Sequence, residues 1–151
     1  AMTDFVVMVE NIGTMFVTGP EVVKEVLSQE VSFEELGGAM THATKSGVAH
    51  FVGKNEYECM DNIKKILSYI PQNNSEPAPI VETTDEPNRF DTNLLNILPE
   101  NPYKQYDMKQ EINFFVEYGD FFEDHELFSE NSIEGFARMY GKSVGIIADL
   151  P

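Results

Sequence analysis

The feature that most constrains this chain is a proline-rich interval near its middle, residues 71–106. Proline lacks a backbone N–H and fixes φ, so closely spaced prolines exclude long helices and central strands. Asn, Asp and Glu fill much of the interval, and residues 94–98 supply a short apolar stretch. We therefore predict a connector between two ordered parts, although length alone favours one domain. The prolines are Pro71, Pro77, Pro79, Pro87, Pro99 and Pro102.

The part before the connector begins with a strand-and-helix pattern. Residues 5–9 and 15–17 are apolar runs that suit buried strands of a parallel sheet. Pro20 then suits the first position of a helix that extends to about Ser28, because its missing N–H would have no helical partner there. The sequence therefore predicts an α/β arrangement.

A longer helix is predicted from Asn55 to the residue before Pro71. Asn55 can cap the helix, and Glu58, three residues on, completes a capping box. Proline at position 71 ends the helix. The apolar residues repeat at the spacing of one helical face, which comprises Cys59, Met60, Ile63, Ile66, Leu67 and Ile70.

The part after the connector is predicted to hold a helix followed by strands. Asp107 can cap a helix that Gly119 ends. Residues 126–128 are a short strand candidate. Residues 133–139 and 143–148 are predicted to form a hairpin, because the Tyr-Gly-Lys sequence between them provides a glycine where positive φ is needed.

Residues 33–50 contain a combination that core packing does not require. The segment has glycines at Gly37, Gly38 and Gly47, where a backbone bends or approaches something closely. Between them lie small hydrogen-bonding residues and cations without the apolar periodicity of a core helix. We therefore predict a loop that lines a cleft.

The charge balance excludes two classes of partner. Acidic residues outnumber basic residues by 26 to 10, which gives a net charge of −16. This charge repels nucleic acids and anionic lipid surfaces, so we expect no binding to either. The single cysteine, Cys59, excludes an internal disulfide, and no apolar run approaches the length of a membrane span. We expect a cytoplasmic location.

Several blocks of the sequence resemble one enzyme family. The chain is similar to the carboxyltransferase (beta) subunit of biotin-dependent acyl-CoA carboxylases and of the related acyl-CoA decarboxylases, of the propionyl-CoA carboxylase and methylmalonyl-CoA decarboxylase type. Members of this family are several hundred residues long and have two similar halves, so the chain resembles an internal fragment of one. The matching blocks are residues 1–5, 16–23, 37–50, 69–74, 102–108, 135–138 and 144–147.

The resemblance implies a fold and a division of the chain. The implied fold is crotonase-like, an α/β superhelix of β-β-α units, of which the chain would hold the end of the first half and the start of the second. Residues 1–70 would be the C-terminal part of the N-terminal carboxyltransferase domain, and 71–106 the connector between domains. Residues 107–151 would begin the C-terminal domain.

The resemblance also implies an activity: the parent protein would move a carboxyl group between carboxybiotin and the α-carbon of a short acyl-CoA. Biotin would be carried on a partner carrier domain, and the parent enzyme would be a homo-oligomer whose active sites form where subunits meet. The family's oxyanion holes fall outside this chain, so no catalytic residue is assigned. The acyl-CoA and the direction of transfer stay open. Candidate substrate-binding residues are Phe16, Thr18, Gly19, Pro20, Gly37, Gly38, Thr41, His42, Ser46 and Gly47.

Other interpretations of these residues remain open. The segment around Gly19 could simply start a helix or could present N–H groups to an anionic substrate. His42 is favoured as a hydrogen-bonding anchor over a general base, and His50 as a satisfied histidine at a strand. With His125, these histidines are too scattered along the chain to predict a metal site. A different class of function is a non-catalytic module that assembles with itself.

Overall fold

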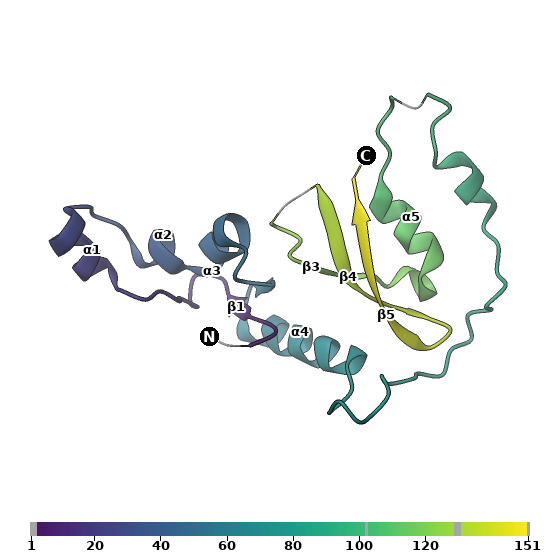
Figure 1. The fold of residues 1–151 in the computed structure, drawn as a ribbon, viewed down its shortest axis with the longest axis horizontal. Coiled ribbons are helices and arrows are strands. Elements are labelled where there is room, and N and C mark those ends of the chain that lie inside the picture. Colours follow the sequence, from purple (N-terminus) through teal and green to yellow (C-terminus); the bar gives the residue numbers. More distant parts are fainter. Residues whose placement is uncertain (1–2, 102, 129–130, 151) are drawn as a thin grey trace. The chain divides into compact units, whose positions relative to one another are not determined.

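The computed structural model describes residues 3–101, 103–128 and 131–150 (Figure 1). Contacts divide the chain into two compact units. The described residues of the first unit are 3–65 and 125–128, and those of the second are 66–101, 103–124 and 131–150. Three positions in the sequence blocks above, Ala1, Met2 and Pro102, lie outside the described residues.

The first unit contains a small parallel sheet. Strands β1 (Val7–Val9) and β2 (Phe51–Gly53) pair in parallel, with Met8 opposite Val52. Their apolar side chains pack into a core of Met8, Ala39, Ala43 and Ala49, with Val6, Met15 and Val52 packed against it. The predicted strand at residues 5–9 is confirmed as part of a parallel sheet, although only Val7–Val9 of that run form the strand.

The second predicted strand, at residues 15–17, is wrong. Thr14 makes an isolated bridge to Gly38, and Met15 continues as irregular backbone. Val17 is fully exposed. The apolar run was a misleading signal because a strand also needs a partner with free backbone groups along its length. Here that partner, around Gly38, turns into a helix.

Helix α1 (Pro20–Leu27) confirms the predicted helix that starts at Pro20. Its C-cap, Ser28, has a left-handed backbone conformation with φ of 55° and donates its N–H to the Lys24 carbonyl at 3.0 Å. All eight helical residues are described, and none of them is buried. The helix therefore forms with its apolar side chains Val22, Val26 and Leu27 exposed.

Most of the segment 33–50 is helical where a loop was predicted, and its helical turns end at Ser46. Three short turns follow one another: α2 (Phe33–Gly37), α3 (Ala39–Thr41) and a π-helical turn, η1 (His42–Ser46). Ala39 and Ala43 lie four residues apart, on one side of this backbone, and both are buried. Two alanines are a weak apolar signal, so the pattern of residues did not predict these helical turns.

Helix α4 (Glu56–Tyr69) begins as predicted. Asn55 Oδ1 accepts a hydrogen bond from the Glu58 N–H at 3.0 Å, and Glu58 Oε2 accepts one from the Lys54 N–H at 3.0 Å. The glutamate thus caps one residue earlier than a standard capping box.

The apolar face predicted for α4 is partly wrong. Cys59, Ile66 and Tyr69 are buried, whereas Met60, Ile63 and Leu67 are more than a third exposed. Cys59 Sγ donates a hydrogen bond to the Met8 carbonyl at 3.3 Å, within the first unit. The spacing of apolar residues allowed two neighbouring stripes on one helix, and packing partners far away in sequence decide which is buried.

The second unit is built on an antiparallel sheet in the order β3 (Phe122–Asp124), β4 (Ser132–Met139), β5 (Lys142–Asp149). The predicted hairpin is confirmed. Tyr140 and Gly141 both have positive φ, 53° and 72°, as a two-residue hairpin turn requires.

A helix of the same unit packs on this sheet. Helix α5 (Met108–Phe115) is capped by Asp107, whose Oδ1 accepts from the Lys109 N–H at 2.9 Å. A 3₁₀ turn, η3 (Glu117–Gly119), follows. The core of the unit joins residues of the helix to alternate residues of β4: Ile112, Val116, Ile133 and Ala137.

The strand predicted at residues 126–128 is wrong, because the strand lies earlier, at β3. Residue His125 has φ of 54°, and the Phe128 N–H donates to its carbonyl at 2.8 Å. This is a tight turn, which ends the strand.

The described connector residues, 71–101 and 103–106, are irregular apart from a 3₁₀ helix, η2 (Thr92–Asn96), and an isolated bridge from Ile80 to Lys142. They pack within the second unit: the Val81 N–H donates to the Gly141 carbonyl at 2.9 Å, and the Tyr118 hydroxyl accepts from the Thr84 N–H at 3.0 Å. The assignment of 1–70, 71–106 and 107–151 to portions of two family halves stays a prediction. None of the described helices is both long and apolar enough to cross a lipid bilayer.

Candidate functional site

His42 joins two segments of the first unit. Its Nε2 lies 2.5 Å from the Met15 carbonyl oxygen and its Nδ1 lies 2.8 Å from Ser46 Oγ. A carbonyl oxygen accepts hydrogen bonds, so Nε2 carries the proton and, in the neutral ring, Nδ1 accepts from the serine hydroxyl. Both ring nitrogens are engaged, which agrees with the predicted role of His42 as an anchor.

Gly37 allows the same Met15 segment to approach the helical turns. The Met15 N–H donates to the Gly37 carbonyl at 2.7 Å, and a Cβ on Gly37 would lie 2.2 Å from the Met15 carbonyl oxygen. Two backbones are therefore in direct contact here. Any side chain at residue 37 would separate them.

Gly38 has a different neighbour. A Cβ on this residue would lie 2.1 to 2.3 Å from the carboxyl group of Glu34, which occupies the space that a side chain would take. The backbone of Gly38 is extended, with φ of −72° and ψ of 167°, so its conformation does not require glycine. Thr41 Oγ1 donates to the Glu34 carbonyl at 2.8 Å and fixes this turn.

Gly47 is held by residues from much later in the chain. It has φ of 65°, and a Cβ would lie 2.7 Å from the Phe128 ring. His125 Nε2 donates to the Gly47 carbonyl at 3.0 Å, and the His125 N–H donates to the His50 carbonyl at 3.2 Å. Residues 125 and 128 are therefore part of this site, and sequence reasoning missed them because 78 residues separate His125 from Gly47.

Two of the three histidines, whose positions along the chain are too scattered to predict a metal site, lie together. The rings of His50 and His125 have centroids 4.3 Å apart. His50 Nδ1 accepts a hydrogen bond from the Val6 N–H at 3.2 Å, which agrees with the predicted role of a satisfied histidine beside a strand. The absence of a metal stays a prediction.

The turn at Thr18, Gly19 and Pro20 is poorly suited to bind an anion. Pro20 has no N–H, and the N–H groups of Val22 and Val23 both donate to the Gly19 carbonyl, at 3.1 and 3.3 Å. Among the first described residues of α1, this leaves the N–H of Glu21, whose own side chain is acidic. The geometry favours a helix start over a ligand site.

The predicted site residues thus form one group and one outlying segment. Hydrogen bonds and close contacts around the Met15 carbonyl bring together Gly37, His42 and Ser46, and Phe16 packs on Phe33 with ring centroids 5.7 Å apart. Thr18 is exposed. This group is a framework that positions backbone; its side-chain donors are already engaged with protein atoms.

One ionisable group beside this framework is perturbed. The Ser32 backbone N–H and hydroxyl donate to the Glu35 carboxylate at 2.9 and 2.7 Å. These hydrogen bonds, together with the charge of Lys45, lower the pKa of Glu35 below its ordinary 4.5. Glu35 is therefore a structural cap of α2.

Comparison with known proteins identifies the family. The carboxyl transferase domain matches residues 1–151. The chain is 48% identical over 151 residues to methylmalonyl-CoA decarboxylase subunit alpha of Veillonella parvula, and 47% identical over the same length to the propionyl-CoA carboxylase carboxyltransferase subunit of Haloferax mediterranei. In both cases 100% of this chain is covered, but 30% and 29% of the relative. The chain therefore spans less than a third of the length of these relatives.

A solved structure agrees with the sequence comparison. The crystal structure of transcarboxylase 12S, described as a hexamer assembly with methylmalonyl-coenzyme A and methylmalonic acid bound, superposes with a TM-score of 0.94 at 39% identity. The match covers 99% of this chain and 29% of that one. The fold is thus the crotonase-like α/β fold of that enzyme. The chain belongs to the carboxyl transferase domain family.

Proposed function

We propose that this chain is part of a biotin-dependent carboxyltransferase that moves a carboxyl group between carboxybiotin and the α-carbon of a short acyl-CoA, of the propionyl-CoA and methylmalonyl-CoA class. The observation that carries the proposal is the match of the whole chain, with a TM-score of 0.94, to an enzyme structure that has methylmalonyl-coenzyme A bound. The similarity to both a decarboxylase and a carboxylase subunit supports the same transfer, run in either direction.

The described residues fit a supporting role in this reaction. Carboxyl transfer develops negative charge on the thioester oxygen and on the ureido oxygen of biotin, and fixed N–H donors stabilise such charges. In the described part of the first unit, the donors of Gly38, His42 and Met15 bond to protein carbonyls, at 3.0, 2.5 and 2.7 Å. We therefore assign no catalytic residue here.

The role of the ten candidate substrate-binding residues remains a proposal, and we propose two different roles for them. Those around the Met15 carbonyl, among them Gly37 and His42, would fix the shape of the wall against which the acyl-CoA lies. Phe16, packed on Phe33, would supply apolar surface at the same wall. Biotin, when bound, accepts the carboxyl group, and carboxybiotin donates it. A partner carrier domain would bring either form to the acyl-CoA.

Carboxyl transfer by the protein that contains this chain tests the proposal. We expect label from methylmalonyl-CoA carrying ¹⁴C in its carboxyl group to move to added biotin or to the biotin carrier domain, with propionyl-CoA as the product. Avidin should block the transfer, because it sequesters biotin. The absence of transfer from methylmalonyl-CoA, with carrier supplied and the protein folded, would contradict the proposal.

A second candidate, a self-assembling module, has one observation in its favour. Val22, Val26 and Leu27 of α1 are 45%, 72% and 60% exposed, which is unusual for three apolar residues of one short helix. We propose that other copies of the protein cover such surfaces; transcarboxylase 12S is described as a hexamer assembly. Light scattering after size exclusion tests this, since a monomer would contradict it.

A cytoplasmic location stays a prediction from the single cysteine.

A further inference from the structure

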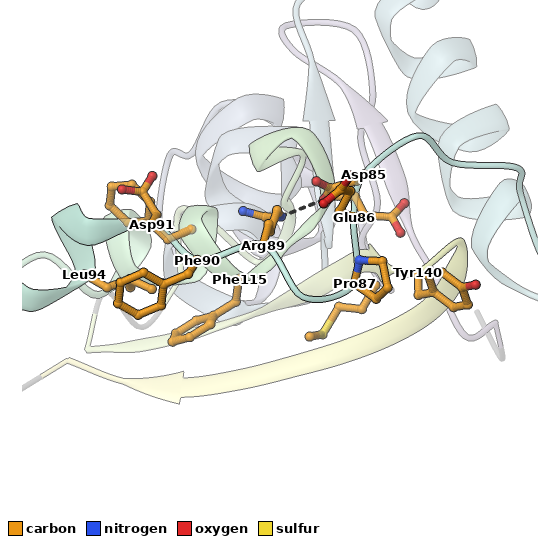
Figure 2. A pocket seen from close by; sticks show the side chains of 12 residues that line it. Asp85, Glu86, Pro87, Arg89, Phe90, Asp91, Leu94, Phe115 and Tyr140 are labelled. Carbon is orange, nitrogen blue, oxygen red and sulfur yellow. Dashed lines mark hydrogen bonds and ion pairs between the residues drawn. The ribbon is translucent and has the colours of Figure 1, made fainter.

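A cavity with an aromatic lining in the second unit lies outside the framework above. It is formed where the connector residues 85–94 pass the end of α5 and the hairpin turn, and its volume is about 460 Å³ (Figure 2). Its described lining residues are Asp85, Glu86, Pro87, Arg89, Phe90, Asp91, Leu94, Phe114, Phe115, Glu117, Met139 and Tyr140.

The aromatic part of the lining is open to solvent. Phe90, Phe115 and Tyr140 are 70%, 50% and 62% exposed, and Met139 is 45% exposed. Figure 2 shows Phe90, Leu94 and Phe115 at one end of the pocket and Pro87 and Tyr140 at the other. Exposed aromatic rings and methionine that gather in one hollow are typical of surfaces that bind another molecule.

The charged part of the lining is acidic and is largely engaged, apart from one residue. Arg89 donates from Nε to Asp85 Oδ2 at 2.9 Å and from a terminal nitrogen to the Val116 carbonyl at 2.6 Å, so its charge is neutralised within the wall. The Glu117 carboxylate accepts from the Gly141 N–H, and Asp91 caps η2. Glu86 is exposed, and Figure 2 shows it at the end of the pocket that holds Pro87 and Tyr140.

This combination selects a cation on an apolar stem. Aromatic faces attract cations through their quadrupoles, and a planar guanidinium stacks on rings while it donates to a carboxylate. An anionic ligand would meet four carboxylates against one arginine that is already paired. A second copy of this chain would bring a net charge of −16 towards a surface of the same sign, so a different, basic polypeptide is the better complement.

We propose that this pocket receives an arginine side chain of a basic partner polypeptide, with Glu86 as its charge partner and Tyr140 as a stacking surface. The inference is independent of the proposed carboxyl transfer. It predicts a docking point that is used even if the reaction catalysed by the protein is a different one.

The test uses the full-length protein with ¹³C-labelled methionine methyl groups and the probe acetyl-glycyl-arginyl-glycinamide. The Met139 signal is assigned by its loss in Met139→Leu. We expect a saturable shift of this signal with the arginine probe and none with the matched probe in which neutral citrulline replaces arginine, because citrulline keeps the shape and removes the charge. The binding should weaken as salt is raised.

Three variants sharpen the result. Glu86→Gln and Tyr140→Leu should each weaken binding by about fivefold, since they remove the charge partner and the aromatic face while keeping most of the volume. Glu82→Gln is the matched control, because Glu82 is exposed on the same connector and does not line the described pocket; its affinity should be unchanged. Each variant is exposed, and unchanged thermal unfolding checks that it folds.

Several outcomes would overturn the proposal. These are equal binding of the citrulline probe, no saturable Met139 shift with the arginine probe, or wild-type affinity in Glu86→Gln. A fourth is self-association that Glu86→Gln abolishes, because the occupant would then be a second copy of the protein.

Discussion

The first unit holds its candidate site by contacts between backbones far apart in sequence, whereas the second unit holds most of its sheet by the ladder of one local hairpin. In the first, the Met15 carbonyl receives His42 and lies against Gly37. In the second, β4 and β5 pair without interruption from Ser132 opposite Asp149 to Met139 opposite Lys142 (Figure 1).

The difference shows how each region tolerates change. A hairpin distributes its stability over many equivalent hydrogen bonds and cross-strand pairs, so most single positions can vary. The framework around Met15 depends on a few atoms, and any other residue in place of Gly37 would push its backbone away from that of Met15. We therefore expect substitutions in the first unit to have large effects at particular atoms, and those in the second to have large effects at the turn.

The largest expected effect is that of Gly37→Ala in the full-length protein. Its Cβ would meet the Met15 carbonyl oxygen at 2.2 Å, so one backbone must move, and we expect a loss of at least about 2 kcal/mol in the free energy of unfolding. Acyl-CoA turnover should fall as well. Urea unfolding and steady-state kinetics measure the two effects.

Gly38→Ala is the matched control for that substitution. Its Cβ would meet the end of the flexible Glu34 side chain, which can turn away, and the backbone of Gly38 is one that alanine adopts. We expect a smaller loss of stability than for Gly37→Ala. Equal losses would show that the contact with Met15 has no special importance.

The next largest effect is expected at the hairpin turn. Gly141 has φ of 72°, and a Cβ there would lie 2.1 Å from the Val81 carbonyl oxygen, whereas a Cβ on Gly145 meets no described atom within 4 Å. Gly141→Ala should therefore cost roughly 1 to 3 kcal/mol, and Gly145→Ala should stay within about 0.5 kcal/mol of the wild type. Thermal unfolding of the two variants checks the contrast. A similar cost at both positions would mean that the ladder, and not the turn, limits stability.

The same contrast explains what could be predicted from sequence. The hairpin around Tyr140 and Gly141, the start of α4 at Asn55 and the start of α1 at Pro20 were predicted correctly, because each is specified by residues within a few positions of one another. Their turn and capping chemistry is local. The family was also identified from blocks of sequence, which the comparisons confirm.

Three of the errors involve distant partners. The run at residues 15–17 has the composition of a strand, but its neighbour Gly38 starts a helix. The buried stripe of α4 includes Tyr69 because Phe136 and Arg138 pack on its ring, with Arg138 4.3 Å above the centroid. His125 and Phe128 were missed at Gly47 for the same reason. Local patterns do not contain this information.

An intermediate effect is expected for His42→Gln. Glutamine can replace one of the two hydrogen bonds, to the Met15 carbonyl or to Ser46, but not both in the same geometry, so we expect a loss of about 1 to 2 kcal/mol. Ser46→Ala removes only the longer of the two hydrogen bonds, so it should lower the free energy of unfolding by less. If His42 is an anchor, the pH–rate profile for acyl-CoA turnover keeps its shape in His42→Gln while the rate falls. Loss of a limb of that profile would instead identify a general base.

The smallest expected effect is a loss of stability at alkaline pH. Cys59 in the first unit and Tyr69 in the second contribute to this loss. Burial raises the pKa of the Cys59 thiol above its ordinary 9.0 in the first unit, and burial, then the charge of Asp120, raises the pKa of Tyr69 above its ordinary 10.0 in the second. A raised pKa means that the folded state keeps a proton that the unfolded chain releases. The contribution of each group is therefore fully present below its ordinary pKa and is lost as the pH rises through the folded value.

Unfolding in urea between pH 8 and pH 11 measures this loss. Cys59→Ala should flatten the decline that begins near pH 9, and Tyr69→Phe should flatten the part that begins near pH 10, while its ring still stacks on Phe136. Because the two groups lie in different units, the pH at which the slope changes reports which unit is affected. A decline that is identical in wild type and both variants would mean that neither side chain stays shielded from water when the protein is folded.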